Sequence, residues 1–84
     1  MNDLIKFPTH FSIKIIGINS SELISSTIDD IKSIIPDFNN EPKIKLSSKD
    51  NYIALTFDIF VNSRQILEKI YLKLNKNSLV KFTL

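Results

Sequence analysis

The sequence is short of the residues on which most catalytic and metal sites depend. It has no cysteine, one glycine and one histidine among 84 residues. Without cysteine there is no disulfide, no thiolate metal site and no cysteine nucleophile. The one histidine, His10, precedes an expected strand and has no evident partner for acid–base catalysis. We therefore predict no catalytic residue, no metal site and no cofactor, and expect that the chain is not an enzyme.

Charge and hydropathy exclude further classes. The net charge is only +2, and lysines supply nearly all of the positive charge because Arg64 is the single arginine. Proteins that recognise nucleic acid favour the bidentate guanidinium, so this composition argues against such a partner. No apolar run approaches the ~18 residues of a membrane span, and residues 1–6 do not resemble a signal peptide. We expect a cytoplasmic protein without membrane contact.

The length allows one domain, which we assign to residues 1–84 with residues 1–9 as an N-terminal arm. Hydrophobic residues make up 43% of the chain, enough for a dense core of isoleucine and phenylalanine side chains.

The first half of the chain changes from a period of two to a helical period. Residues 10–18 alternate as a strand. Apolar residues at positions 24, 28, 31 and 35 then indicate an amphipathic helix. We predict that Asn19 caps this helix, because Glu22 follows it at capping-box spacing, and that the helix continues to Pro36.

The second half repeats this order. Residues 43–46 and 52–61 alternate as two strands and predict a hairpin, with Asp50 or Asn51 at positive φ in its turn. Asn62 is the expected cap of a second helix that contains Ile66, Ile70 and Leu74, and residues 80–84 alternate as a closing strand.

The order β-α-β-β-α-β predicts an α+β, ferredoxin-like sandwich, in which two helices cover one face of a four-stranded antiparallel sheet. The first and third strands should lie in the middle. We expect the helix-facing side chains to be Ile13, Ile15, Ile44, Leu46, Leu55, Phe57, Ile59, Val80 and Phe82. We expect the open face to carry Ser12, Lys14, Lys45, Thr56, Asp58, Lys81 and Thr83.

Several spaced motifs carry a family resemblance: Phe7-Pro8-Thr9, Phe11, Ile13-Lys14-Ile15-Ile16-Gly17, Ser47-Ser48-Lys49, Asn51-Tyr52 and Val80-Lys81. Over nearly its whole length the chain resembles the YbeD-like family of small bacterial proteins. It departs from the family pattern in two turns, with Asp50 in place of a glycine and no His-Pro pair before the last strand. The resemblance implies a ferredoxin-like fold similar to ACT regulatory domains, and the family is functionally uncharacterised.

An ACT-like ligand loop is one candidate site. A small metabolite of the amino-acid type could bind where a glycine permits close approach and a helix N-terminus offers amide donors. The residues of this loop are Gly17, Ile18, Asn19, Ser20 and Ser21. Structural capping of the helix by its own side chains competes with this interpretation.

An interaction surface is the other candidate. We expect Asp58 to lie near Lys14 or Lys81 on the open sheet face, and Phe7 with Pro8 to fix the chain entry or to form a docking lip. The candidate surface comprises Phe7, Pro8, Lys14, Tyr52, Thr56, Asp58 and Lys81. RNA binding ranks third, because only Tyr52 and Phe60 could stack on bases and Asp58 between them would repel phosphate.

The sequence therefore favours a non-catalytic regulatory or protein-interaction module that docks or forms a homodimer through its sheet. The alternative is a domain that senses a small metabolite, with the site at a subunit interface.

Overall fold

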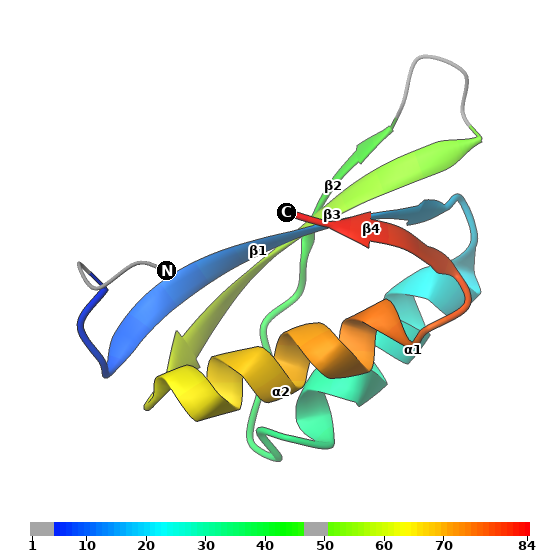
Figure 1. The fold of residues 1–84 in the computed structure, drawn as a ribbon. Helices are drawn as coiled ribbons and strands as arrows, with labels where there is room; N and C mark the ends of the chain where they lie inside the picture. The colour runs from blue at the N-terminus through cyan, green and yellow to red at the C-terminus, as the bar shows by residue number, and fades with distance from the viewer. Residues whose placement is uncertain (1–4, 47–50) are drawn as a thin grey trace.

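The computed structural model describes residues 5–46 and 51–84. Within them it contains β1 (Thr9–Ile18), α1 (Ser21–Lys32), β2 (Lys43–Leu46), β3 (Tyr52–Val61), α2 (Arg64–Asn75) and β4 (Val80–Thr83). The strands form one antiparallel sheet in the order β2-β3-β1-β4, and Figure 1 shows both helices on one side of it. The ferredoxin-like plan with β1 and β3 in the centre is confirmed. The expected hairpin turn, including Asp50, lies outside the described residues.

Serines cap both helices one residue later than expected. The Ser20 hydroxyl accepts a hydrogen bond from the backbone N–H of Leu23, and Ser63 caps α2 in the same way. Our assignment of the caps to Asn19 and Asn62 was wrong. Asn19 still belongs to the sheet: its N–H donates to the Asn51 carbonyl at 3.1 Å and so is not available for the capping-box bond to Glu22.

The first helix also ends earlier than expected. It stops at Lys32, and Ser33 follows as the C-cap with its hydroxyl donating to the Asp30 carbonyl. The chain makes one further tight turn before Pro36, so the proline lies beyond the helix end rather than at it.

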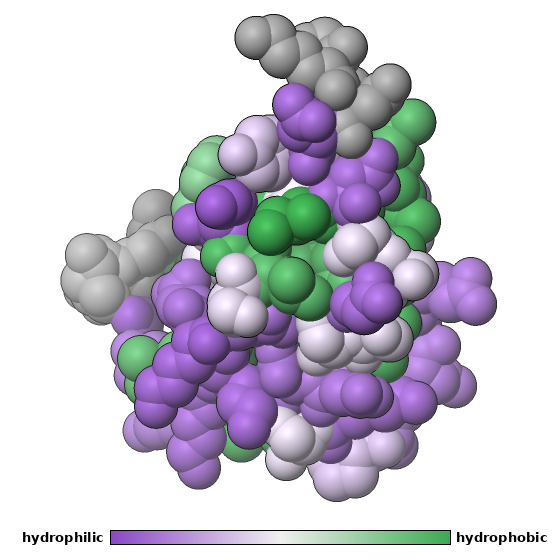
Figure 2. All heavy atoms as spheres, turned by 90° about the vertical axis from the view of Figure 1, so that its right-hand side faces the viewer, coloured by the Kyte–Doolittle hydropathy of each residue, from purple (hydrophilic) through white to green (hydrophobic). Residues whose placement is uncertain are grey.

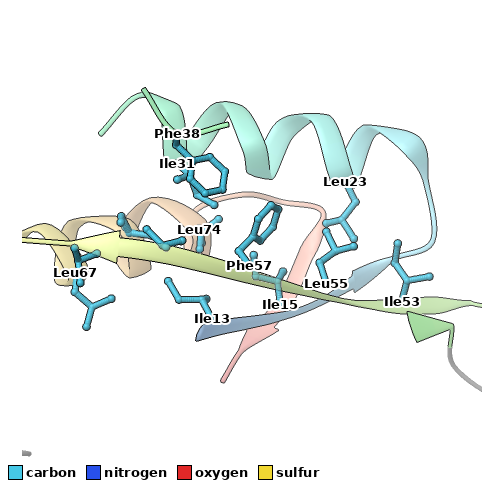
Figure 3. Packing of buried hydrophobic residues seen from close by; sticks show 13 residues of the cluster. Ile13, Ile15, Leu23, Ile31, Phe38, Ile53, Leu55, Phe57, Leu67 and Leu74 are labelled. Atoms are coloured by element: carbon cyan, nitrogen blue, oxygen red, sulfur yellow. The ribbon is translucent and has the colours of Figure 1, made fainter. Parts of the chain in front are cut away.

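The core lies between the sheet and the helix layer, as Figure 3 shows. Ile13, Ile15, Leu55, Phe57 and Ile59 are fully buried on the helix side of β1 and β3, as predicted. Leu23 and Ile31 of α1, together with Leu67, Ile70 and Leu74 of α2, close the core from the other side. The one buried polar side chain in the described residues, Thr27, donates its hydroxyl to the Leu23 carbonyl at 2.7 Å.

Two apolar residues expected in the core are exposed. Ile44 and Leu46 of β2 pair with Leu55 and Ile53, so they lie on the helix side of the sheet. β2 is an edge strand, however, and both side chains remain more than half exposed. The expectation was right about the face and wrong about burial. Neither helix is long and apolar enough to cross a membrane.

Asn77 ties the turn before β4 to α1. Its side-chain amide donates to the Ser26 hydroxyl and to the Asp30 carboxylate, each at 2.9 Å. Its side-chain oxygen accepts from the Leu79 N–H at 3.0 Å. This cluster fixes where β4 enters the sheet, because the Asn77 carbonyl also accepts from the Val80 N–H.

Candidate interaction surface

The register of the sheet arranges the open face in rows that run across the strands. Residues paired on neighbouring strands share a face and lie about 4.8 Å apart. We call the end of the face near the β1–α1 connection the apolar half. From that end inward its rows are Ile18–Tyr52, then Phe82–Ile16–Ala54–Lys45, then Leu84–Lys14–Thr56–Lys43. The remaining rows, Ser12–Asp58 and His10–Phe60, form the polar half.

A bulge in β4 brings Phe82 to this face. The pairing of β4 shifts by one residue between Ile16 and Gly17 of β1, so that Lys81 is the extra residue. An extra residue reverses the alternation beyond it. Phe82 therefore lies outward beside Ile16, and Thr83 lies on the helix side, where its hydroxyl donates to Asn75. Our expectation for both residues was the reverse, and it was wrong.

The apolar half exposes large side chains. The exposed fractions are 37% for Ile18, 43% for Tyr52, 52% for Phe82 and 63% for Leu84. Figure 2 faces the end of the molecule where β1 leads into α1, and hydrophobic side chains gather there with hydrophilic ones around them. Given side-chain areas of roughly 150–250 Å², these fractions amount to about 350 Å² of exposed apolar surface. That is within the range of the largest patch on an ordinary monomer, which is often functional.

Lysines lie among and beside the apolar side chains of this half. Lys14, Lys43 and Lys45 stand within its rows, and the exposed Lys81 lies in the bulge. A groove of about 240 Å³ runs between Lys14 and Lys45 over an apolar floor that includes Ile16 and Ala54. None of the four lysines forms an ion pair with any described residue.

The last residue of the chain is held to this face by α2. Leu84 exchanges two backbone hydrogen bonds with Lys14, which extends the β1–β4 pairing to the end of the chain. The Tyr71 hydroxyl donates to the Leu84 carbonyl at 3.2 Å, and partial burial raises the pKa of this phenol. The exposed Leu84 side chain is thus presented from a fixed backbone.

The polar half contains a histidine–carboxylate contact that the sequence did not reveal. The His10 Nδ1 lies 3.6 Å from the Asp58 Oδ1, and the imidazole packs edge-on against Phe60. Asp58 was expected near Lys14 or Lys81. The register sets it opposite Ser12, with His10 and Lys14 as its diagonal neighbours on β1, and its carboxylate contacts His10 rather than Lys14. A groove of about 360 Å³ surrounds the pair.

Serine, histidine and aspartate are the residue types of a hydrolytic triad, yet the geometry does not form one. The described residues show no hydrogen bond between Ser12 and His10, so no base activates the hydroxyl. The side chains of His10 and Asp58 are 72% and 68% exposed, so both polar groups are largely solvated. Among the described residues no three metal-ligating side chains lie close enough to hold an ion.

The Gly17–Ser21 loop is closely packed. A Cβ at Gly17 would lie 2.6 Å from the Leu79 carbonyl oxygen and 2.6 Å from a Leu23 methyl group. The loop's backbone donors are partly used, since the Ile18 N–H donates to Leu79 and the Asn19 N–H to Asn51. The glycine is therefore needed for the close approach of the protein's own backbone.

The remaining candidate residues lie apart from the apolar half. Phe7 packs against the hydrophobic core, as expected for a residue that covers a core edge, and a cis peptide bond joins it to the exposed Pro8. Both precede β1 and lie at the polar end of the sheet. The structure thus brings Lys14, Tyr52 and Thr56 onto one surface and adds residues that the sequence analysis did not select, chiefly Ile16, Phe82 and Leu84.

Comparisons with known proteins agree with the fold. Protein HP0495 from H. pylori superimposes with a TM-score of 0.82 over 99% of this chain and 88% of that chain, at 14% identity. The ACT domain of a GTP pyrophosphokinase from Chlorobium tepidum has a TM-score of 0.56 at 25% identity, covering 90% of this chain and 97% of that one. The ferredoxin-like fold with its likeness to ACT domains is thereby confirmed.

Sequence comparison gives the family. A UPF0250 protein of Buchnera aphidicola subsp. Baizongia pistaciae is 30% identical over 84 residues, which cover 100% of this chain and 94% of that protein. A UPF0250 protein of Janthinobacterium sp. is 32% identical over 83 residues, or 96% and 90% of the two chains. A family model described as "Protein of unknown function (DUF493)" matches residues 2–84. The chain therefore belongs to the DUF493 or UPF0250 family, which is the YbeD-like family of uncharacterised bacterial proteins that its motifs indicated.

Proposed function

We propose that this chain is a non-catalytic protein-interaction module whose partner docks on the apolar half of the open sheet face. The observation that carries the proposal is the outward row of Phe82, Ile16 and Ala54, continued by Tyr52 and Ile18. A protein of this size needs its large apolar side chains in the core. A partner that covers these aromatic and aliphatic side chains would explain why they are exposed together.

A non-catalytic role agrees with the polar half. The His10–Asp58 pair is solvated, and no nucleophile among the described residues is hydrogen-bonded to it, so it resembles an ordinary cross-strand contact between polar side chains. The polar half then serves as part of the scaffold.

Two phenylalanines on the same face provide a matched test. Phe82 is 52% exposed in the apolar half, and Phe60 is 50% exposed in the polar half. We expect tagged wild-type chain to retain a stoichiometric protein from a lysate of the bacterium that encodes it. Phe82→Ser should lose that protein, whereas Phe60→Ser should keep it.

Folding must be checked alongside capture. Because both side chains are half exposed, each substitution should lower the melting temperature by only a few degrees. Equal retention by the two folded variants would refute docking on the apolar half, and so would retention that depends on Phe60 alone.

A second candidate is sensing of an amino-acid-type metabolite at the Gly17–Ser21 loop. It is supported by the likeness to the ACT domain of a GTP pyrophosphokinase, and the exposed Ser21 at the start of α1 would be its entry. At a concentration 100 times its Kd, a bound ligand adds about 2.7 kcal/mol and so raises the melting temperature by about 11–22 °C. A panel of the twenty amino acids should contain one such ligand, and Ser21→Tyr should abolish its effect; a panel without any shift would refute this candidate.

A further inference from the structure

We infer that the partner of the apolar half is an acidic segment, in which aspartate or glutamate side chains flank apolar anchors and bind the row formed by Lys14, Thr56 and Lys43. This inference rests on the proposed docking function and adds the chemistry of the partner.

The row has the geometry of an anion site. Lys14 on β1 and Lys43 on β2 both pair with Thr56 on β3. With strands about 4.8 Å apart, their Cα atoms are separated by roughly 10 Å, and each lysine carries a four-carbon stem. Both ammonium groups can therefore reach one carboxylate above Thr56. The Thr56 hydroxyl is available as a donor, since it makes no hydrogen bond to the described residues.

The size of the patch requires a contribution from its charged border. A stable interface buries about 800 Å² on each partner, more than twice the exposed apolar surface of this half. The rest of the contact must include the neighbouring Lys14, Lys43, Lys45 and Lys81. Glu41 and Asp58 line one groove with Lys43, yet none of the four lysines forms an ion pair within the described residues. A partner that brings carboxylates to Lys14, Lys45 and Lys81 therefore gains both attraction and orientation.

Charge also distinguishes this occupant from a second copy of the chain. A two-fold contact through the apolar half would bring the lysines of both copies into one interface, where like charges repel. The acids nearest to the row, Glu41 and Asp58, lie together at one end of it, in the groove that His10 and Lys43 also line, so they do not offset the repulsion between Lys14, Lys45 and Lys81 of the two copies.

A single-stranded nucleic acid fits less well than an acidic segment. Stacking of successive bases needs flat side chains that follow one another, and the two aromatic side chains of the apolar half, Tyr52 and Phe82, stand in different rows on β3 and β4, with β1 between them. The only arginine, Arg64, belongs to the helix layer.

Selection of peptides tests the inference without knowledge of the natural partner. The probe is a random 12-residue phage library panned on the full-length chain, and enriched peptides are then synthesised with a fluorescent label. We expect them to carry a net negative charge together with aromatic or aliphatic residues. Raising the salt concentration from 50 to 200 mM should weaken their binding several-fold.

Two charge-reversed double variants provide a matched comparison. Lys14→Glu with Lys43→Glu should weaken binding of the selected peptides at least tenfold. Lys32→Glu with Lys69→Glu changes the net charge equally but lies on exposed positions of the helices. This control should keep the Kd within twofold.

Each other outcome overturns a definite part of the reasoning. Enriched peptides that are apolar without net negative charge, and that lose binding with Phe82→Ser, refute the acidic partner but leave docking intact. Peptides indifferent to Phe82→Ser refute docking on the apolar half itself. Failure to enrich any peptide would refute a linear acidic segment as the partner. Binding of a labelled 12-base oligothymidine more tightly than the selected peptides would assign the lysine row to nucleic acid.

Discussion

Replacement of Asn77 by alanine should destabilise the protein strongly, although Asn77 belongs to no helix or strand. The substitution removes three hydrogen bonds, of which the one to Asp30 involves a charged acceptor. A bond to a charged group contributes about 1.5–3 kcal/mol and a neutral one about 0.5–1.5 kcal/mol. Because Asn77 is half-buried and water replaces part of the loss, we expect a cost of about 3 kcal/mol.

Thermal denaturation measures this cost directly. In a domain of this size 1 kcal/mol corresponds to about 4–8 °C, so Asn77→Ala should lower the melting temperature by at least ~12 °C. Asn39→Ala, at an exposed loop position, is the control and should shift it by less than about 3 °C.

A double-mutant cycle identifies the partner. Asn77→Ala combined with Asp30→Ala should show a coupling energy of at least ~1 kcal/mol. A drop below about 4 °C, or a coupling near zero, would refute the conclusion that this cluster anchors the entry to β4.

Two further predictions concern the same end of the fold. Gly17→Ala should cost about 1–3 kcal/mol by urea denaturation, because the new methyl group overlaps the Leu79 carbonyl, which cannot move without shifting β4; a change below about 0.5 kcal/mol would contradict the close packing. Burial raises the pKa of Tyr71 in the folded state above the ordinary 10.0. The neutral phenol therefore contributes fully to the free energy of unfolding below pH 10, and this contribution is lost as the pH rises through the folded-state pKa. The urea midpoint should therefore fall less between pH 8 and pH 11 in Tyr71→Phe than in the wild type, and equal falls would refute the effect of burial.

Local patterns in the sequence predicted most of the fold, because each pattern depends only on residues that are close together along the chain. The alternation over residues 52–61 matches β3 throughout, since every second side chain there is needed in the core. The caps were missed by one residue because Asn19 and Ser20 have similar capping ability. In the structure Asn19 continues the pairing of β1, since its N–H donates to the carbonyl of Asn51 just before β3, and the next residue, Ser20, becomes the cap.

The partners on the open face could not be deduced from the sequence. Alternation assigns Asp58 to a face, but its neighbours depend on the register between β1 and β3, a long-range property. The register sets Asp58 opposite Ser12 and next to His10, whereas the position opposite Lys14 belongs to Thr56. The histidine–carboxylate contact at His10 thus follows from tertiary pairing alone.

The largest error, the orientation of Phe82, bears most directly on function. Val80, Phe82 and Leu84 alternate with polar residues, and a regular strand would have placed all three on the core side. The bulge keeps Val80 against the core and turns the other two outward, at the expense of their burial. Gly17 permits this arrangement by letting the Leu79 carbonyl approach β1 closely. A small domain that gives up core contacts of two large side chains loses several kcal/mol of potential burial, which is a large share of its total stability. Sequence rules tend to fail where a fold serves function rather than stability, and here they fail at the two side chains that complete the proposed docking surface.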